Sequence, residues 1–228
     1  MDNIVTFLQG IHLNDNKEWY MANRESYAQA FYDNAQYIQQ LIKLIGDFDE
    51  TIRYHRLPDC SYALLRPHKL KLDTRKYNDY LGGFFARAGK NSGYGGYYYH
   101  ISPLPSDSGG SLLAAGIFNP SRELLTAFRR DAEKNGATIM ELIRRSGFKL
   151  LERDKFIRMP SGFNIEPEYR DLLLQRHIMI IKRVDISWFY HEKWLERTAR
   201  QFRNCKPFID YINNIVTENN LYNTPKRR

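Results

Sequence analysis

The sequence predicts an α+β fold, with helices packed around a small, mainly antiparallel sheet. Three observations indicate it. Apolar residues recur at helical spacing near both ends of the chain, two segments in the middle have the pattern of a β-hairpin, and no internal repeat is present. A chain of 228 residues that is 43% hydrophobic can bury one sizeable core, so we expect residues 1–228 to form a single domain.

Two helices are expected before residue 50. Ile4, Val5 and Leu8 indicate a short first helix, and the cap-forming residues 14–16 separate it from a longer one. The stripe of the longer helix is Tyr20, Arg24, Tyr27, Phe31, Ala35, Ile38, Ile42 and Ile45. Because an unpaired buried charge is costly, Arg24 is expected in an ion pair, along the surface with its head in water, or in the floor of a pocket.

Strands are expected where polar and apolar residues alternate or where a short run is wholly apolar. The segments are 60–66, which Pro67 ends, 97–102 and 112–118 as a hairpin, a pair of short strands within 148–159, and 177–184. In the first hairpin strand, Tyr97, Tyr99 and Ile101 share one face. Tyr98 and His100 share the other.

Helices account for most of the remaining chain. Their expected ranges are 121–135, 138–146, 168–175, 187–203 and 207–219. Gly147 has the position of a C-terminal cap, and Ser121 has that of an N-terminal cap.

The net charge of +8 is uneven along the chain. Residues 53–90 carry nine Lys or Arg against three Asp or Glu, whereas the basic surplus after residue 119 is spread along helices, as on a solvated face. Residues 66–103 join this basic segment to glycines and to a run of tyrosines, which favours an anion-binding pocket. The residues expected to bind the ligand are Arg24, Arg66, Lys69, Tyr77, Tyr98 and His100. His100 is the only expected proton-transfer group.

Several classes of function are disfavoured. The longest apolar run, 112–118, is too short for a membrane span, and the first residues lack the pattern of a leader, so a cytoplasmic protein is expected. Cys60 and Cys205 form no metal-binding motif, the six histidines lack ligand spacing, and no phosphate loop is found, so we expect no metal and no cofactor. Nucleic-acid binding is expected to be weak or non-specific, because no recognition motif accompanies the basic charge.

Motifs spread over nearly the whole chain resemble a known family. They are Asn16-x-x-Trp19-Tyr20-x-x-Asn23-Arg24-x-x-Tyr27, residues 96–103, Ala115-Gly116-Ile117-Phe118-x-Pro120, Arg158-Met159-Pro160-x-Gly162-Phe163 and residues 206–213. The sequence resembles the bacterial and fungal family of domain of unknown function 2461. No activity is established for that family, so the resemblance supports the single domain and implies no reaction.

One stretch departs from the family pattern. Where relatives carry an acid and a lysine, this chain has Pro67 and Asn78, and Lys69 replaces an arginine. If that stretch is the family's active centre, the resemblance implies that an ionisable pair is lost here while anion binding remains.

The expected function is therefore the binding of an anionic or polar small ligand in a basic, tyrosine-lined pocket. Two alternatives stay open. One is a structural or partner-binding module that uses the basic C-terminal helices, and the other is an enzyme acting on a phosphorylated or acidic substrate. The ligand and the oligomeric state do not follow from the sequence.

Overall fold

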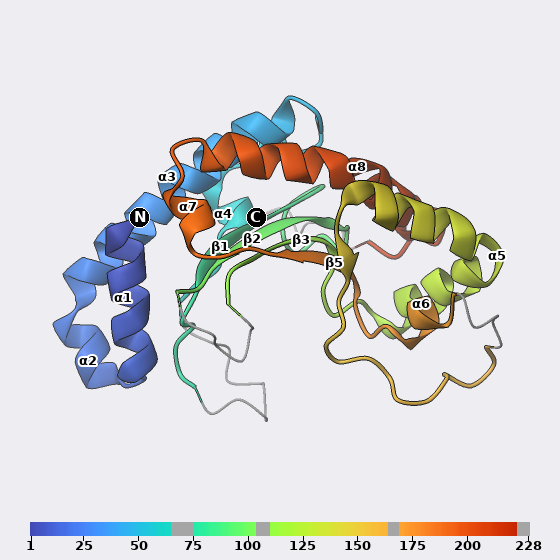
Figure 1. The fold of residues 1–228 in the computed structure, drawn as a ribbon, viewed down its shortest axis with the longest axis horizontal. Coiled ribbons are helices and arrows are strands. Elements are labelled where there is room, and N and C mark those ends of the chain that lie inside the picture. Colours follow the sequence, from blue (N-terminus) through green and yellow to red (C-terminus); the bar gives the residue numbers. More distant parts are fainter. Residues whose placement is uncertain (65–74, 104–109, 164–168, 223–228) are drawn as a thin grey trace.

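The fold was analysed in a computed structural model that describes residues 1–64, 75–103, 110–163 and 169–222. Helices surround a sheet (Figure 1), which confirms the α+β prediction. Within the described ranges the sheet has five strands in the order β1-β2-β3-β5-β4, each antiparallel to its neighbour. The strands are β1 (Leu81–Ala86), β2 (Gly96–Ile101), β3 (Leu112–Ile117), β4 (Lys149–Leu150) and β5 (Ile178–Arg183).

The prediction of one long second helix near the N-terminus is wrong, because this segment forms two helices. After α1 (Asp2–Leu13), α2 (Lys17–Ala22) ends at Asn23, whose side chain donates a hydrogen bond to the Trp19 carbonyl at 2.9 Å. Next, α3 (Arg24–Gly46) begins on a new axis, and its buried positions start only at Ala30. Arg24 is therefore exposed rather than part of an apolar stripe.

The prediction of a strand over residues 60–66 is also wrong in the part that the structure describes. A short helix, α4 (Leu57–Cys60), occupies its start, and Ser61 makes only an isolated bridge with Gly83. The strand in this region is β1, which the sequence analysis did not predict. Its two central glycines lower strand propensity, and pairing with β2 along its whole length compensates.

The hairpin of β2 and β3 and the later strand β5 confirm three predicted segments. Residues 148–159, all of them described, contain only the two-residue β4 and no second strand. The helices that follow β3 are α5 (Arg122–Ser146), α6 (Arg170–Leu174), α7 (Ser187–Tyr190) and α8 (Trp194–Glu218).

Both α5 and α8 join segments that were expected to be separate helices. α5 continues through Asn135, which has a non-helical φ of −121° and marks a kink. α8 passes through Pro207, a residue that normally ends or kinks a helix because it lacks an N–H donor. Cys205 and Phe208 are buried on either side of the exposed proline, so packing holds the helix together there. No helix in the described ranges is both long and apolar enough to cross a membrane.

The two faces of the sheet differ. On one face Tyr97 and Tyr99 are fully buried against α3 and α8, which lie across it in Figure 1. The Tyr99 hydroxyl donates to Asn34 at 2.8 Å, and its ring packs against Trp194. Because strand residues alternate in direction, Tyr98 and His100 point to the opposite face.

Candidate functional site

The candidate site lies at the end of the sheet where β1 begins and β2 ends. Leu81 pairs with Ile101 there, so the residues just before β1 lie beside the last residues of β2. His100 is buried, with 3% of its surface exposed, and its ring stacks on Tyr80 with the centroids 4.2 Å apart. The Tyr98 hydroxyl lies 3.0 Å from Nδ1 of His100. Stacking and hydrogen bonding together fix the imidazole.

The His100 imidazole is uncharged at neutral pH. Burial lowers its pKa to about 4, and the nearby carboxylate of Asp79 opposes this effect only in part. Burial also raises the pKa of Tyr98 well above its usual value, so its hydroxyl keeps its proton. The hydrogen bond between the Tyr98 hydroxyl and Nδ1 of His100 therefore joins two uncharged groups.

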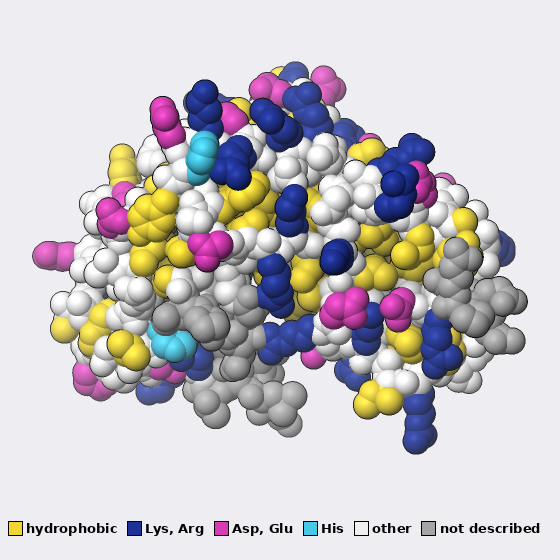
Figure 2. Space-filling model, viewed as in Figure 1, with side chains coloured by type: hydrophobic (Ala, Val, Ile, Leu, Met, Phe, Trp, Pro, Cys, Tyr) yellow, Lys and Arg dark blue, Asp and Glu magenta, His cyan; other side chains and the backbone are white. Residues whose placement is uncertain are grey.

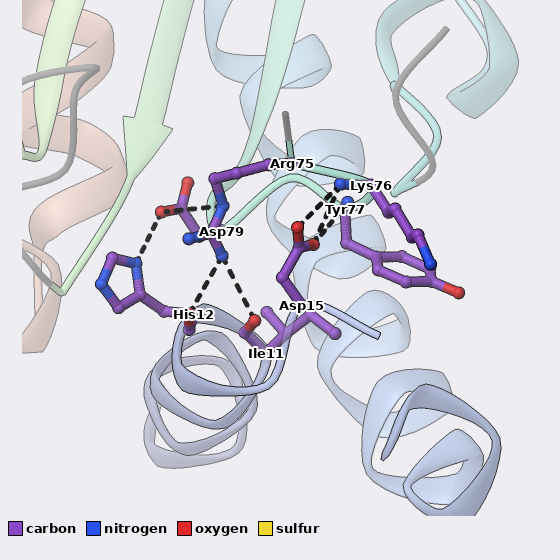
Figure 3. A network of polar contacts seen from close by, with 7 residues as sticks. All are labelled: Ile11, His12, Asp15, Arg75, Lys76, Tyr77 and Asp79. Carbon is purple, nitrogen blue, oxygen red and sulfur yellow. Dashed lines mark hydrogen bonds and ion pairs between the residues drawn. The ribbon is translucent and has the colours of Figure 1, made fainter. Parts of the chain in front are cut away.

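Asp79 is the centre of the charged part of this cluster. Its side chain is 4% exposed and contacts Nδ1 of His12 at 2.8 Å and Nε of Arg75 at 3.9 Å (Figure 3). A buried carboxylate is costly unless it is paired, so these contacts stabilise its charge. They also hold the His12 ring, which is about one-third exposed at 31%, with its other nitrogen directed away from Asp79.

The C-terminal end of α1 positions these groups. Nη2 of Arg75 donates to the carbonyls of Ile11 and His12, each at 3.2 Å. The last carbonyls of a helix have no partner within it and carry partial negative charge, so a guanidinium binds well there. The Asp15 carboxylate accepts from the backbone N–H groups of Lys76 and Tyr77 (Figure 3). The segment before β1 is thus bound both to the last turn of α1 and to Asp15 in the loop that follows α1.

Metal and thiol chemistry find no support in the described ranges. No group of three or more His, Cys, Asp or Glu in them is arranged to hold a metal ion. Cys60 and Cys205 are both buried, and burial raises the pKa of the Cys60 thiol to about 12 and also raises that of Cys205. Neither thiol is an activated nucleophile, because the thiolate is the reactive form.

Comparison with known proteins identifies the family. Residues 3–211 match the model of a conserved hypothetical protein family, DUF2461. The chain belongs to this family. No curated protein and no solved structure is similar enough to be matched with it.

Much of the DUF2461 pattern in this chain is structural. Asn16 caps α2 by accepting from the Trp19 N–H at 2.8 Å, and in α8 Lys206 pairs with Asp210 one turn later. Tyr97 and Tyr99 are core residues. Tyr98 and His100 lie on the opposite face of the same strand, within the polar cluster at the sheet end.

The six residues expected to bind a ligand are not all brought together. Tyr98 and His100 lie in contact, whereas Tyr77 is 4% exposed and its ring stacks on Tyr20 with the centroids 5.0 Å apart. Exposed Arg24 makes none of the contacts that hold the cluster, so placing it in a pocket floor is not supported. The predictions for Arg66 and Lys69 lie outside the described residues.

Sequence reasoning missed His12, Asp79 and Tyr80, and it counted Arg75 only as part of a basic run. His12 and Asp79 are 67 residues apart, and no periodic pattern connects them. Recognising β1 in the sequence would have placed Asp79 and Tyr80 near the site. Once Leu81 is placed opposite Ile101, Asp79 and Tyr80 must lie next to the end of β2.

Proposed function

We propose that the protein binds an anionic or polar small molecule at the end of the sheet, around Tyr98, His100 and the Asp79 ion pairs. The observation that supports this most is the environment of His100, a buried and uncharged imidazole held between Tyr80 and Tyr98. Buried titratable groups with strongly shifted pKa values are concentrated at functional sites. Here the shift accompanies a cluster of hydrogen-bonding groups on the sheet face opposite the core.

The charges of the cluster favour an anion. Arg75 and His12 both lie against Asp79, and the imidazole of His12 stays partly exposed. A ligand carboxylate or phosphate would meet the free side of the His12 ring, while neutral groups such as the Tyr98 and His100 side chains would select for shape and hydrogen bonding. The alternative function, a module that binds a partner through the basic C-terminal helices, does not explain why these polar groups are clustered.

A second candidate function, proton transfer, is favoured by the contact between His12 and Asp79. A carboxylate that accepts from Nδ1 orients the ring, and the second nitrogen is then available to a substrate. His100 is less suited to this role than the sequence suggested, since a histidine with a pKa of about 4 is a weak base.

The test is a thermal-shift screen with succinate and citrate as anions, and glycerol as a neutral polar probe. We expect at least one anion to raise the melting temperature of the unmodified protein, and glycerol to raise it less. Tyr98→Phe and His12→Asn should each abolish the increase. Tyr94→Phe is the matched control, because its hydroxyl only approaches Thr217 at 3.5 Å.

Two results would count against the proposal. One is the absence of any anion-dependent increase. The other is an increase that survives in both Tyr98→Phe and His12→Asn, which would place the binding site elsewhere on the protein.

A further inference from the structure

A groove on the surface, separate from the sheet-end cluster, lies between the end of β5, α7 and α8. Its volume is about 570 Å³, and Lys182, Arg183, Trp188 and Arg197 are among the residues that line it. Figure 2 shows Lys and Arg side chains along the face of the molecule that carries β5 and α8. Ligand sites in proteins commonly have volumes in this range.

Arg197 is held in the groove by a neutral ring. Its guanidinium lies over Trp188, 4.2 Å from the ring centroid. The indole is itself fixed, because its Nε1 donates to the buried Thr198 hydroxyl at 3.0 Å. A cation–π contact orders the arginine without cancelling its charge, so its N–H groups can still bind an anion.

Lys182 is ordered in a similar way. Its ammonium donates to the side-chain oxygen of Gln201 at 2.8 Å, and Gln201 lies one turn after Arg197 on α8. The amide is also neutral. Two cations that line the groove, one from β5 and one from α8, are thus positioned in advance, which lowers the entropy cost of binding.

Acidic side chains do little to neutralise the groove. Asp185 is the one carboxylate among the lining residues, against Lys182, Arg183 and Arg197. It accepts from the backbone N–H of Ser187 at 2.9 Å, and this hydrogen bond lowers its pKa. The Asp185 carboxylate therefore faces the backbone at the start of α7.

The contrast with α5 is informative. There Arg144 and Arg145 both bind Glu141, at 2.7 and 2.6 Å, and the carboxylate offsets their charge. Arg197 and Lys182 are held instead by an indole and an amide. We propose that this groove binds the phosphate group of a small molecule, with the phosphate between Arg197 and Lys182.

A phosphate fits this arrangement for two reasons. It carries up to two negative charges, which match two adjacent cations, and its oxygens can accept two parallel hydrogen bonds from a guanidinium. At the sheet end, by comparison, Arg75 already binds Asp79 and two carbonyls. The proposal for the groove stands independently of the proposed function.

The experiment is calorimetric titration with inorganic pyrophosphate and with adenosine 5′-monophosphate, using adenosine as the probe without phosphate. Arg197→Met and Lys182→Met should each weaken pyrophosphate binding by about tenfold, since each removes a charge-assisted hydrogen bond. Arg197→Lys should give an intermediate loss, because the charge stays and the paired geometry is lost. The control, Arg144→Met with Arg145→Met, removes two exposed cations and should change the affinity less than twofold.

A short oligothymidylate completes the set of probes. Binding of the oligonucleotide without binding of either small phosphate would overturn the proposal in favour of a nucleic-acid surface. Equal weakening in the control variant would also overturn it, since the effect would then reflect net charge alone. If Arg197→Met does not fold, Lys182→Met provides the test, because Lys182 is only half-buried. His12→Asn should leave pyrophosphate binding unchanged, which separates this groove from the sheet-end site.

Discussion

The Tyr98 hydroxyl and Nδ1 of His100 are 3.0 Å apart, although the two residues belong to one strand and are separated only by Tyr99. Side chains two positions apart on a strand point the same way, so this pair can form without help from a neighbouring strand. Burial keeps the tyrosine protonated and the imidazole neutral. The hydrogen bond therefore joins two uncharged groups.

Removing the Tyr98 hydroxyl should destabilise the protein. Tyr98→Phe removes the hydrogen bond to Nδ1 of a buried histidine, which costs about 1–3 kcal/mol in the free energy of unfolding. Urea denaturation measures this, with Tyr94→Phe as the control that removes a hydroxyl at a 3.5 Å contact. A loss no larger than that of the control would show that the hydrogen bond contributes little.

The stability of the protein should fall as the solution is acidified through the His100 window. The folded-state pKa of about 4 lies below the usual value of 6.5, so the unfolded chain binds a proton first as the pH decreases. Stability from this group is complete above pH 6.5 and is lost progressively down to pH 4, by about 3 kcal/mol in total.

The measurement is urea denaturation of the unmodified protein and of His100→Asn over that range of pH. His177, whose pKa is also lowered by burial, contributes equally to both proteins and cancels in the comparison. Parallel pH profiles for the two proteins would mean that His100 is protonated as readily in the folded state as in the unfolded one.

Asp79→Asn should be more damaging than most single substitutions. It leaves Arg75 without its carboxylate and removes the ion pair with His12 at a site that is 4% exposed. Loss of one partner of a buried ion pair costs about 3–5 kcal/mol. Thermal denaturation provides the test, with Glu141→Gln as the surface counterpart. Similar losses from both variants would argue that the Asp79 network is no stronger than a surface ion pair.

Alanine substitutions at Gly116 and Gly147 distinguish two causes of strain, a steric clash and a left-handed backbone. Both have positive φ, 133° and 72°, but a Cβ at Gly116 would lie 2.1 Å from the Ile178 carbonyl oxygen, whereas nothing lies within 4 Å of one at Gly147. Gly147→Ala should therefore cost only about 1–2 kcal/mol for its left-handed backbone. Gly116→Ala should cost clearly more, because β3 and β5 must move apart. Equal losses in denaturation would refute the steric argument.

The parts of the fold that local pattern determines were predictable. Local pattern found β2 through the alternation of its residues and β3 through an apolar run that is buried on both faces, and it also found β5. It failed for β1, where Gly82 and Gly83 weaken the pattern and only pairing with β2 decides. It failed again at Pro207, where the buried side chains around it keep α8 continuous through a residue that usually interrupts a helix.

The same distinction applies to the site. Tyr98 and His100 were recognisable because a polar pair on one strand is a local feature. Arg24 was misplaced because the break at Asn23, which depends on a side-chain hydrogen bond, is not visible in the spacing of apolar residues. His12 and Asp79 meet only through the fold, so no sequence window contains both.

The hydrogen bonds from Arg75 to the last turn of α1 limit when this part of the fold can form during synthesis. The carbonyls of Ile11 and His12 leave the ribosome more than sixty residues before the guanidinium that binds them. Until the chain has been made as far as Arg75, these two carbonyls lack this partner. Contacts between residues so far apart in the sequence form late in folding, because closing the long loop between them costs conformational entropy. Helix α1 is thus synthesised well before the residue that binds the carbonyls of its last turn.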